Sequence, residues 1–110
     1  MTARTNSDQI HGVLDLLVLK VLDAGPTHGY RITVRLQELS ADVLRVEEGS
    51  LYPALYRMEQ RGWISSQWAV TEHNRRARYY RLTRTGRRQL QAETRSWARL
   101  TTAVQGVLDS

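Results

Sequence analysis

A chain of 110 residues with a formal net charge of +5 and no cysteine fits one small domain and excludes disulfides and thiolate metal sites. Hydrophobic residues make up 41% of the sequence and charged residues 25%, values that are ordinary for a globular protein. The first ten residues lack the apolar core of a signal peptide, and the longest apolar stretch, VLDLLVLKVL, is too short and too interrupted to cross a membrane. We therefore expect a cytoplasmic protein without a metal site or a cofactor.

The positive charge is concentrated in one short segment. All of the 16 cationic residues except Lys20 are arginine, and seven arginines fall between Arg75 and Arg88. No aspartate or glutamate occurs from His73 to Ala92. A one-sided cationic cluster indicates a polyanionic partner, and a solvated arginine-rich face is the alternative.

Residues 7–24 are predicted to form the first helix, because apolar residues recur there at helical spacing. Leu16 and Leu19 widen the apolar stripe beyond one face, so this helix must be covered on two sides. A second helix is predicted from about Thr27 to Leu39. The predicted caps are Asn6 with Gln9, or Ser7 alone, for the first helix, Gly25-Pro26 at its end, and Thr27 for the second helix.

The third predicted helix covers residues 51–61. Proline is tolerated in the first turn of a helix, so Pro53 places the cap at Gly49 or Ser50, of which Ser50 is the better hydrogen-bonding cap. Its apolar residues share one arc and form the core side: Leu51, Ala54, Leu55 and Met58. The opposite side carries Tyr52, Pro53, Tyr56, Arg57 and Gln60.

After the third helix the apolar pattern alternates with a period of two, which predicts strands at residues 63–70 and 78–83 joined by the polar loop TEHNRRA. Thr83 or Thr85 would then cap a long last helix that ends near Leu108. Three helices, a hairpin and a long helix are the order of a winged helix-turn-helix followed by a dimerisation helix. We expect a mainly α fold with a small β-hairpin, in which residues 1–83 bind DNA and residues 84–110 dimerise.

In a winged helix the third helix is offered to the DNA major groove. Ser50 and Tyr52 would donate hydrogen bonds to phosphates or base edges, and Arg57 would pair with a phosphate or a guanine. One of Tyr52 and Tyr56 would instead pack beneath the wing or against the first helix, and the sequence leaves open which of them faces DNA.

Four segments, GVLDLLVLKVL, HGYRI, EEGSLYPALYRMEQRGWI and RRARYYRLTRTGRRQL, occur in this order and together resemble the signature of PadR-like transcriptional regulators. The resemblance covers roughly residues 10–91. It implies a homodimeric, cytoplasmic repressor that binds an inverted-repeat DNA operator and is often released by a small molecule. The single terminal helix resembles the compact branch of that family.

Taken residue by residue, the resemblance implies DNA contacts at three places. In the third helix they are Ser50, Tyr52, Pro53 and Arg57, with Tyr56 on the same face. At the start of the second helix Tyr30 would approach a phosphate, whereas Tyr80 is expected to be structural. At the wing, the minor groove or its flanking phosphates would be contacted by Arg75, Arg76 and Arg78. A phosphate contact without sequence specificity is the alternative for each wing arginine.

The long last helix carries a heptad-like apolar stripe that a small domain cannot bury alone. We expect a homodimer in which this stripe also covers the second apolar face of the first helix. Two-fold symmetry would place the two third helices about 34 Å apart, one turn of DNA. The predicted interface residues are Leu16, Leu19, Trp97, Leu100, Val104, Val107 and Leu108.

Trp97 matches a position at which some drug-binding relatives stack a tryptophan on flat ligands. With Leu100 it implies a site for a planar aromatic effector, cationic ligands included, and a simple interface anchor is the alternative. Trp63 and Trp68 are expected to be structural.

An enzyme is not expected, because the histidines are scattered and no nucleophile–histidine–acid grouping or phosphate-binding glycine loop occurs. Two other interpretations remain. One is a winged helix that docks on a protein instead of DNA, against which the arginine-rich wing argues. The other is a DNA-binding regulator that responds to no effector.

Overall fold

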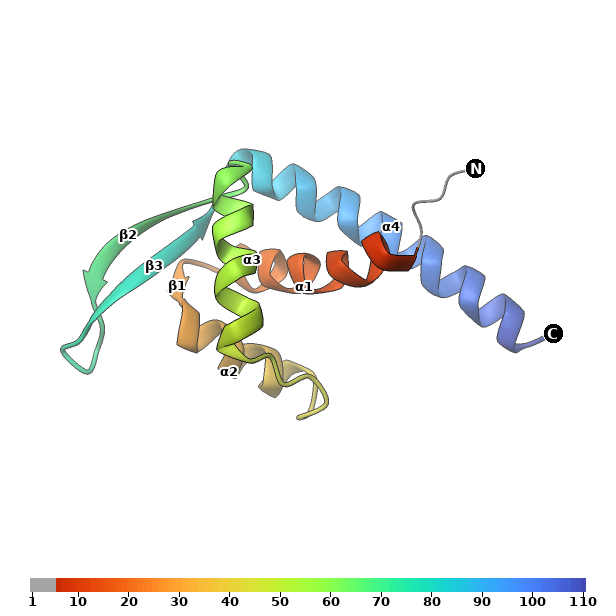
Figure 1. Ribbon diagram of the computed structural model, residues 1–110, viewed down its shortest axis with the longest axis horizontal. Coiled ribbons are helices and arrows are strands. Elements are labelled where there is room, and N and C mark those ends of the chain that lie inside the picture. The colour runs from red at the N-terminus through yellow and green to blue at the C-terminus, as the bar shows by residue number, and fades with distance from the viewer. Residues whose placement is uncertain (1–5) are drawn as a thin grey trace.

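The computed structural model describes residues 6–110, and the side chains from residue 12 onward. These residues form helices packed beside a small antiparallel sheet (Figure 1). In chain order the elements are α1 (Asn6–Asp23), β1 (Thr27–His28), α2 (Gly29–Leu39), α3 (Glu48–Gln60), β2 (Ile64–Val70), β3 (Arg76–Leu82) and α4 (Arg84–Leu108). The predicted mainly α winged-helix fold with a β-hairpin and a long last helix is confirmed.

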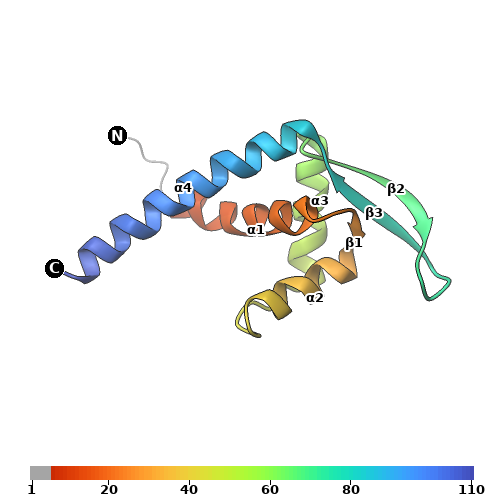
Figure 2. The same ribbon diagram turned by 180° about the vertical axis from the view of Figure 1, so that it is seen from behind.

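The hydrophobic core lies where α1, α2 and α3 meet the base of the hairpin. Its fully buried side chains are Val18, Leu19, Ile32, Leu51, Leu55, Met58 and Ile64. Figures 1 and 2 show α3 crossing α1, the β2–β3 hairpin projecting away from the helices, and α4 running over α1 and beyond it. Leu19 was predicted at a dimer interface, but it is 0% exposed within one chain, so no partner could cover it. Its place is in the core.

The sheet has a third strand that the sequence pattern does not predict. β1 pairs with β3 at one edge, with Thr27 opposite Tyr80 and His28 opposite Tyr79. Thr27 therefore does not cap α2 as predicted. His28 is the cap, and its Nδ1 accepts the backbone N–H of Arg31 at 3.3 Å. A two-residue strand is too short to produce an alternating pattern, so these residues resemble the start of the helix.

α3 begins earlier than predicted. Its cap is Glu47, which makes no side-chain capping hydrogen bond, and its first residue is Glu48. The backbone N–H groups of Ser50 and Leu51 both donate to the Glu47 carbonyl at 3.0 Å, so Ser50 lies inside the first turn and is not the cap. Pro53 consequently lies past the first turn, where it has no N–H to donate to the carbonyl of Gly49, four residues back.

The start of α4 is fixed to the end of α3. Thr83 caps α4 as predicted, since its Oγ1 accepts the N–H of Gly86 at 3.0 Å. The same hydroxyl lies 2.6 Å from the carbonyl oxygen of Gly62, to which it donates. Gly86 is buried against the backbone of Trp63. The first turn of α4 thus packs against the junction of α3 and β2, and the helix then runs over α1 and beyond it (Figure 1).

The predicted caps of α1, Asn6, Ser7 and Gln9, lie outside the residues whose side chains the structure describes. No helix in residues 6–110 combines the length and the apolar character needed to cross a membrane.

Candidate nucleic-acid interface

α3 presents two chemically different faces. Leu51, Leu55 and Met58 are fully buried, whereas Tyr52 is 43% exposed and Tyr56 is 68% exposed. Pro53 is also exposed, and Ser50 is exposed at the edge of the helix that borders Leu14 and Leu17 of α1. Both tyrosines therefore reach solvent, and the predicted division of the helix into a core face and an outer face is confirmed.

Tyr52 lies across the first residue of α2. A Cβ atom at Gly29 would come within 2.8 Å of the ring carbon Cζ of Tyr52, so a side chain at this position would displace the ring. Burial raises the pKa of Tyr52, and the nearby carboxylate of Glu48 raises it further. The phenol is therefore protonated at neutral pH and is available as a hydrogen-bond donor.

Arg57 is held by a partner that the sequence pattern did not predict. Its Nη2 donates to Oδ1 of Asp15 on α1 at 2.6 Å, and the Asp15 side chain is only 8% exposed. The one available signal was the position of Asp15, which interrupts an otherwise apolar stretch of α1. Arg57 is still 39% exposed, so its remaining N–H groups can reach a ligand. Its DNA contact stays a prediction.

The wing ends in an ordered turn. The Oγ1 of Thr71 accepts the backbone N–H groups of His73 and Arg75, both at 3.2 Å. Asn74 has a φ of 60°, the left-handed conformation that asparagine tolerates better than most residues. Arg75 is exposed beside this turn. The tip of the wing therefore offers its arginine from a defined backbone.

Arg78 lies nearer the base of the wing and braces it against α3. Its Nε donates to Oγ of Ser66 at 2.7 Å, and its Nη2 lies 3.5 Å from Oε2 of Glu59. Ser66 also donates to Glu59 at 2.7 Å. The charge of Arg78 is thus partly neutralised by Glu59. In this respect Arg78 differs from Arg75 and Arg76, which lie further out on the wing.

A hollow lies between the inner face of the wing, Tyr52 of α3 and the start of α2. Its lining includes Tyr30, Tyr52, Trp68, Arg76, Arg78 and Tyr80. Trp68 was expected to be structural, yet it is 56% exposed and lies outside the core. Burial raises the pKa of the Tyr80 phenol against the lowering effect of Arg78, and the neighbouring Glu59 and Tyr52 raise it further.

Several known proteins that resemble this chain are transcriptional regulators. The profile of the transcriptional regulator PadR-like family matches residues 18–92. The transcriptional regulator Rv3488 of Mycobacterium tuberculosis is 39% identical over 79 residues, which are 72% of this chain and 70% of that regulator. The chain belongs to the PadR-like family of transcriptional regulators.

Solved PadR-like structures share the fold over nearly the whole chain. A PadR-like transcriptional regulator from Bacillus cereus superposes with a TM-score of 0.77 at 27% identity, over 94% of this chain and 98% of that one. A transcriptional regulator from Clostridium thermocellum superposes with a TM-score of 0.81 at 27% identity, over 90% and 96% of the two chains. DNA binding is therefore the family function that the geometry of α3 and the wing has to serve.

The part of α4 beyond its first turns carries the predicted apolar stripe, and within one PadR-like chain this stripe is uncovered. Trp97 is 42% exposed and Val104 48%, and the exposure rises to 73% at Val107 and 70% at Leu108. Gly86 and Leu90 are the buried residues of the helix, and both lie near its start. Leu16, on α1, is half-buried and borders Trp97 across a narrow gap.

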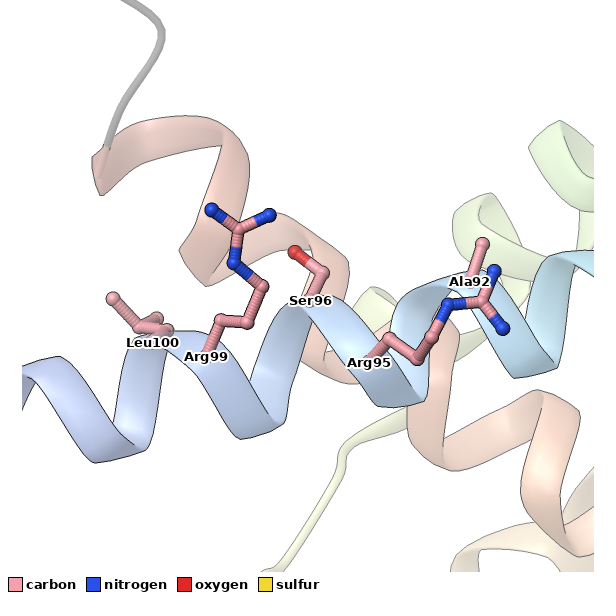
Figure 3. Close-up of a pocket in the computed structure, with 5 residues that line it drawn as sticks. All are labelled: Ala92, Arg95, Ser96, Arg99 and Leu100. Atoms are coloured by element: carbon pink, nitrogen blue, oxygen red, sulfur yellow. The ribbon is translucent and has the colours of Figure 1, made fainter.

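Among the residues whose side chains the structure describes, the predicted effector residues Trp97 and Leu100 border different hollows. An open hollow on α4 is lined by Ala92, Arg95, Ser96, Arg99 and Leu100 (Figure 3). Trp97 instead borders the narrow gap towards α1, together with Gly12 and Glu93.

Proposed function

We propose that this PadR-like regulator is a cytoplasmic homodimeric repressor of an inverted-repeat operator, in which residues 1–83 bind DNA and residues 84–110 dimerise. The observation that carries the proposal is the exposed polar and aromatic face of α3 beside an arginine-bearing wing. α3 would enter the major groove with Ser50, Tyr52, Pro53 and Tyr56 towards the bases and their phosphates. The wing would reach the minor groove or its flanking phosphates.

Two variants test the orientation of this interface. Tyr52→Ala is expected to weaken specific binding by about 1–3 kcal/mol and to relax discrimination within each half-site, since the variant removes a side chain that faces the groove. The double variant Arg75→Ala with Arg76→Ala is expected to weaken binding to all DNA sequences evenly. The slope of log binding constant against log salt concentration should become shallower by about one for each phosphate that is no longer neutralised. Fluorescence anisotropy at several salt concentrations measures both effects.

The control for these variants is Arg35→Ala, which removes an exposed arginine from the middle of α2, where it pairs with Glu38. Its affinity for DNA should equal that of the parent chain. If the Tyr52 variant and the wing variant also bound like the parent chain while remaining folded, the proposed orientation would be wrong.

We propose that α4 and the uncovered side of α1 form the dimer interface, with Leu16, Trp97, Leu100, Val104, Val107 and Leu108 as its apolar residues. Light scattering at micromolar concentration should give about twice the 12.7 kDa chain mass. Val104→Asp should lower this mass towards that of one chain, because a carboxylate would be desolvated in the interface. Thr102→Asp, on the opposite side of α4, should leave it unchanged. A monomeric parent chain, or two variants that behave alike, would contradict the proposed interface.

We propose that a planar effector, where one exists, stacks between the two copies of Trp97 near Leu100 and shifts the spacing of the two α3 helices. Glu93 borders the gap beside Trp97, whereas Arg95 and Arg99 line the hollow beside Leu100, so the lining charges do not favour a ligand of one sign. Titration with planar aromatic acids and, separately, planar aromatic cations should identify a ligand that quenches tryptophan emission in the parent chain, and Trp97→Phe should abolish the quenching. Quenching that persists in this variant would exclude Trp97 as the effector site.

A further inference from the structure

The geometry of double-stranded DNA places a requirement on the space between α3 and the wing. The major and minor grooves are separated by a single sugar–phosphate strand. A protein that inserts α3 into the major groove and its wing into the adjacent minor groove must therefore straddle that strand. The hollow described above, with a volume of about 410 Å³, lies between these two elements and opens beside the start of α2.

We infer that this hollow holds the sugar–phosphate strand between the two grooves, and that Trp68 contacts this strand directly. The inference rests on the proposed function. It adds Trp68 to the DNA contacts that are proposed for α3 and for the arginines of the wing. The indole of Trp68 packs against a deoxyribose. The guanidinium of Arg76 and the hydroxyl of Tyr30 donate to the flanking phosphates.

Trp68 is exposed but fixed in place. It lies directly opposite Arg78 in the β2–β3 ladder. The guanidinium carbon of Arg76 lies 5.2 Å from the centre of a Trp68 ring, and that of Arg78 lies 5.9 Å from it. These cation–π contacts hold both arginines over the ring instead of leaving them extended in solvent. The indole thus presents an apolar surface and positions two positive charges beside it.

The charge around the hollow selects an anion. No acidic residue from residue 12 onward lines it, and the carboxylate of Glu59 nearby is already paired with Arg78 at 3.5 Å. The first turn of α2, which borders the hollow, contains no acidic residue, whereas the first turn of α3 contains Glu48. An incoming phosphate is therefore favoured at the wing side of Tyr52 and disfavoured at the start of α3. The apolar ring of Trp68 would lie against a sugar, and the guanidinium of Arg76 and the phenol of Tyr30 would lie beside phosphates. This order matches the alternation of sugar and phosphate along one DNA strand.

Tryptophan emission from the full-length protein tests this inference. Titration with a random-sequence duplex of about 30 base pairs should change the emission of the parent chain, as contact with a deoxyribose alters the surroundings of the indole. Trp68→Phe should abolish this change. Trp63→Phe is the matched control, since Trp63 lies at the α3–β2 junction under Arg61 and does not border the hollow, and it should keep the change.

Affinity provides an independent measurement. Trp68→Ala should weaken binding by about tenfold, because the variant removes both the ring that positions two arginines and the surface that packs on the sugar. The weakening should be equal for random and selected duplexes, because a backbone contact carries no sequence information. Tyr52→Ala should differ by lowering the ratio of specific to random affinity. Circular dichroism of the Trp68 variants should be that of the parent chain.

Three results would overturn the inference. The first is a Trp68→Ala protein that binds DNA like the parent chain while Trp68→Phe keeps the emission change. The second is an emission change that a flexible acidic peptide produces and duplex DNA does not, which would assign the hollow to a protein partner. The third is a parent chain with no salt-dependent DNA binding, in which case the proposed function fails as well.

Discussion

Gly86→Ala is expected to lower the free energy of unfolding by about 3 kcal/mol, because the added methyl group meets backbone that cannot move aside. A Cβ atom at this position would lie 1.9 Å from the carbonyl oxygen of Trp63 and 2.8 Å from Cδ1 of Leu82. That carbonyl also accepts the backbone N–H of Thr83 at 3.0 Å. Relief of the clash would therefore separate α4 from the junction of α3 and β2. Urea unfolding at a fixed protein concentration measures the change.

The same helix provides the control for this variant. Gly106 lies in α4, and a Cβ atom added there would have no neighbouring atom within 4 Å. Gly106→Ala should stabilise the protein by about 0.5–1 kcal/mol through helix propensity alone. Equal effects of the two glycine variants would show that α4 does not pack on the Trp63 backbone as described.

Arg57→Ala is expected to destabilise the fold by roughly 2–4 kcal/mol, because it leaves the carboxylate of Asp15 buried without its partner. Asp15 is 5% exposed, and the 2.6 Å contact to Arg57 joins α1 to α3. Loss of the exposed Arg35–Glu38 pair should instead change stability by no more than about 0.5 kcal/mol. Chemical unfolding of Arg57→Ala beside Arg35→Ala measures the difference.

A double variant separates the structural role of Arg57 from a DNA contact. Asp15→Leu with Arg57→Met replaces the ion pair by apolar side chains and should recover most of the lost stability. If Arg57 also contacts DNA, this folded double variant should still bind DNA more weakly than the parent chain. A single Arg57→Ala variant as stable as Arg35→Ala would contradict the buried pair.

The periodic spacing of hydrophobic residues predicts most of the helices and strands of the fold. Long segments with a helical or alternating pattern predicted α1, α4 and the hairpin nearly at their observed limits, because burial of one face dominates their energetics. The errors came where that signal is weak. Thr27 and His28 form a strand through backbone pairing with β3, and such pairing leaves no trace in a two-residue pattern. The usual place of proline in the first turn predicts that α3 begins after Ser50, whereas the helix begins at Glu48 and carries Pro53 in its interior.

The sequence predicts those site residues whose orientation follows from their position on one helix. It does not predict contacts between segments that are distant in the sequence. The outer face of α3 follows from the angular positions of Tyr52 and Tyr56. The contact of Arg57 with Asp15 joins residues 42 positions apart and depends on how α3 crosses α1. The exposure of Trp68 likewise depends on how far the wing projects from the helices, and an alternating strand pattern does not contain that information.

Selection of bound fragments from a pool of random DNA, followed by sequencing, tests the central claim most directly. A homodimer that reads DNA through α3 should enrich an inverted repeat whose half-sites are centred about 10 base pairs, one helical turn, apart. Binding of the enriched fragment should weaken as salt is added, because counterions compete for the phosphates. A pool that shows no enriched sequence and no salt-dependent retention would contradict the assignment of α3 and the wing as a DNA-reading surface.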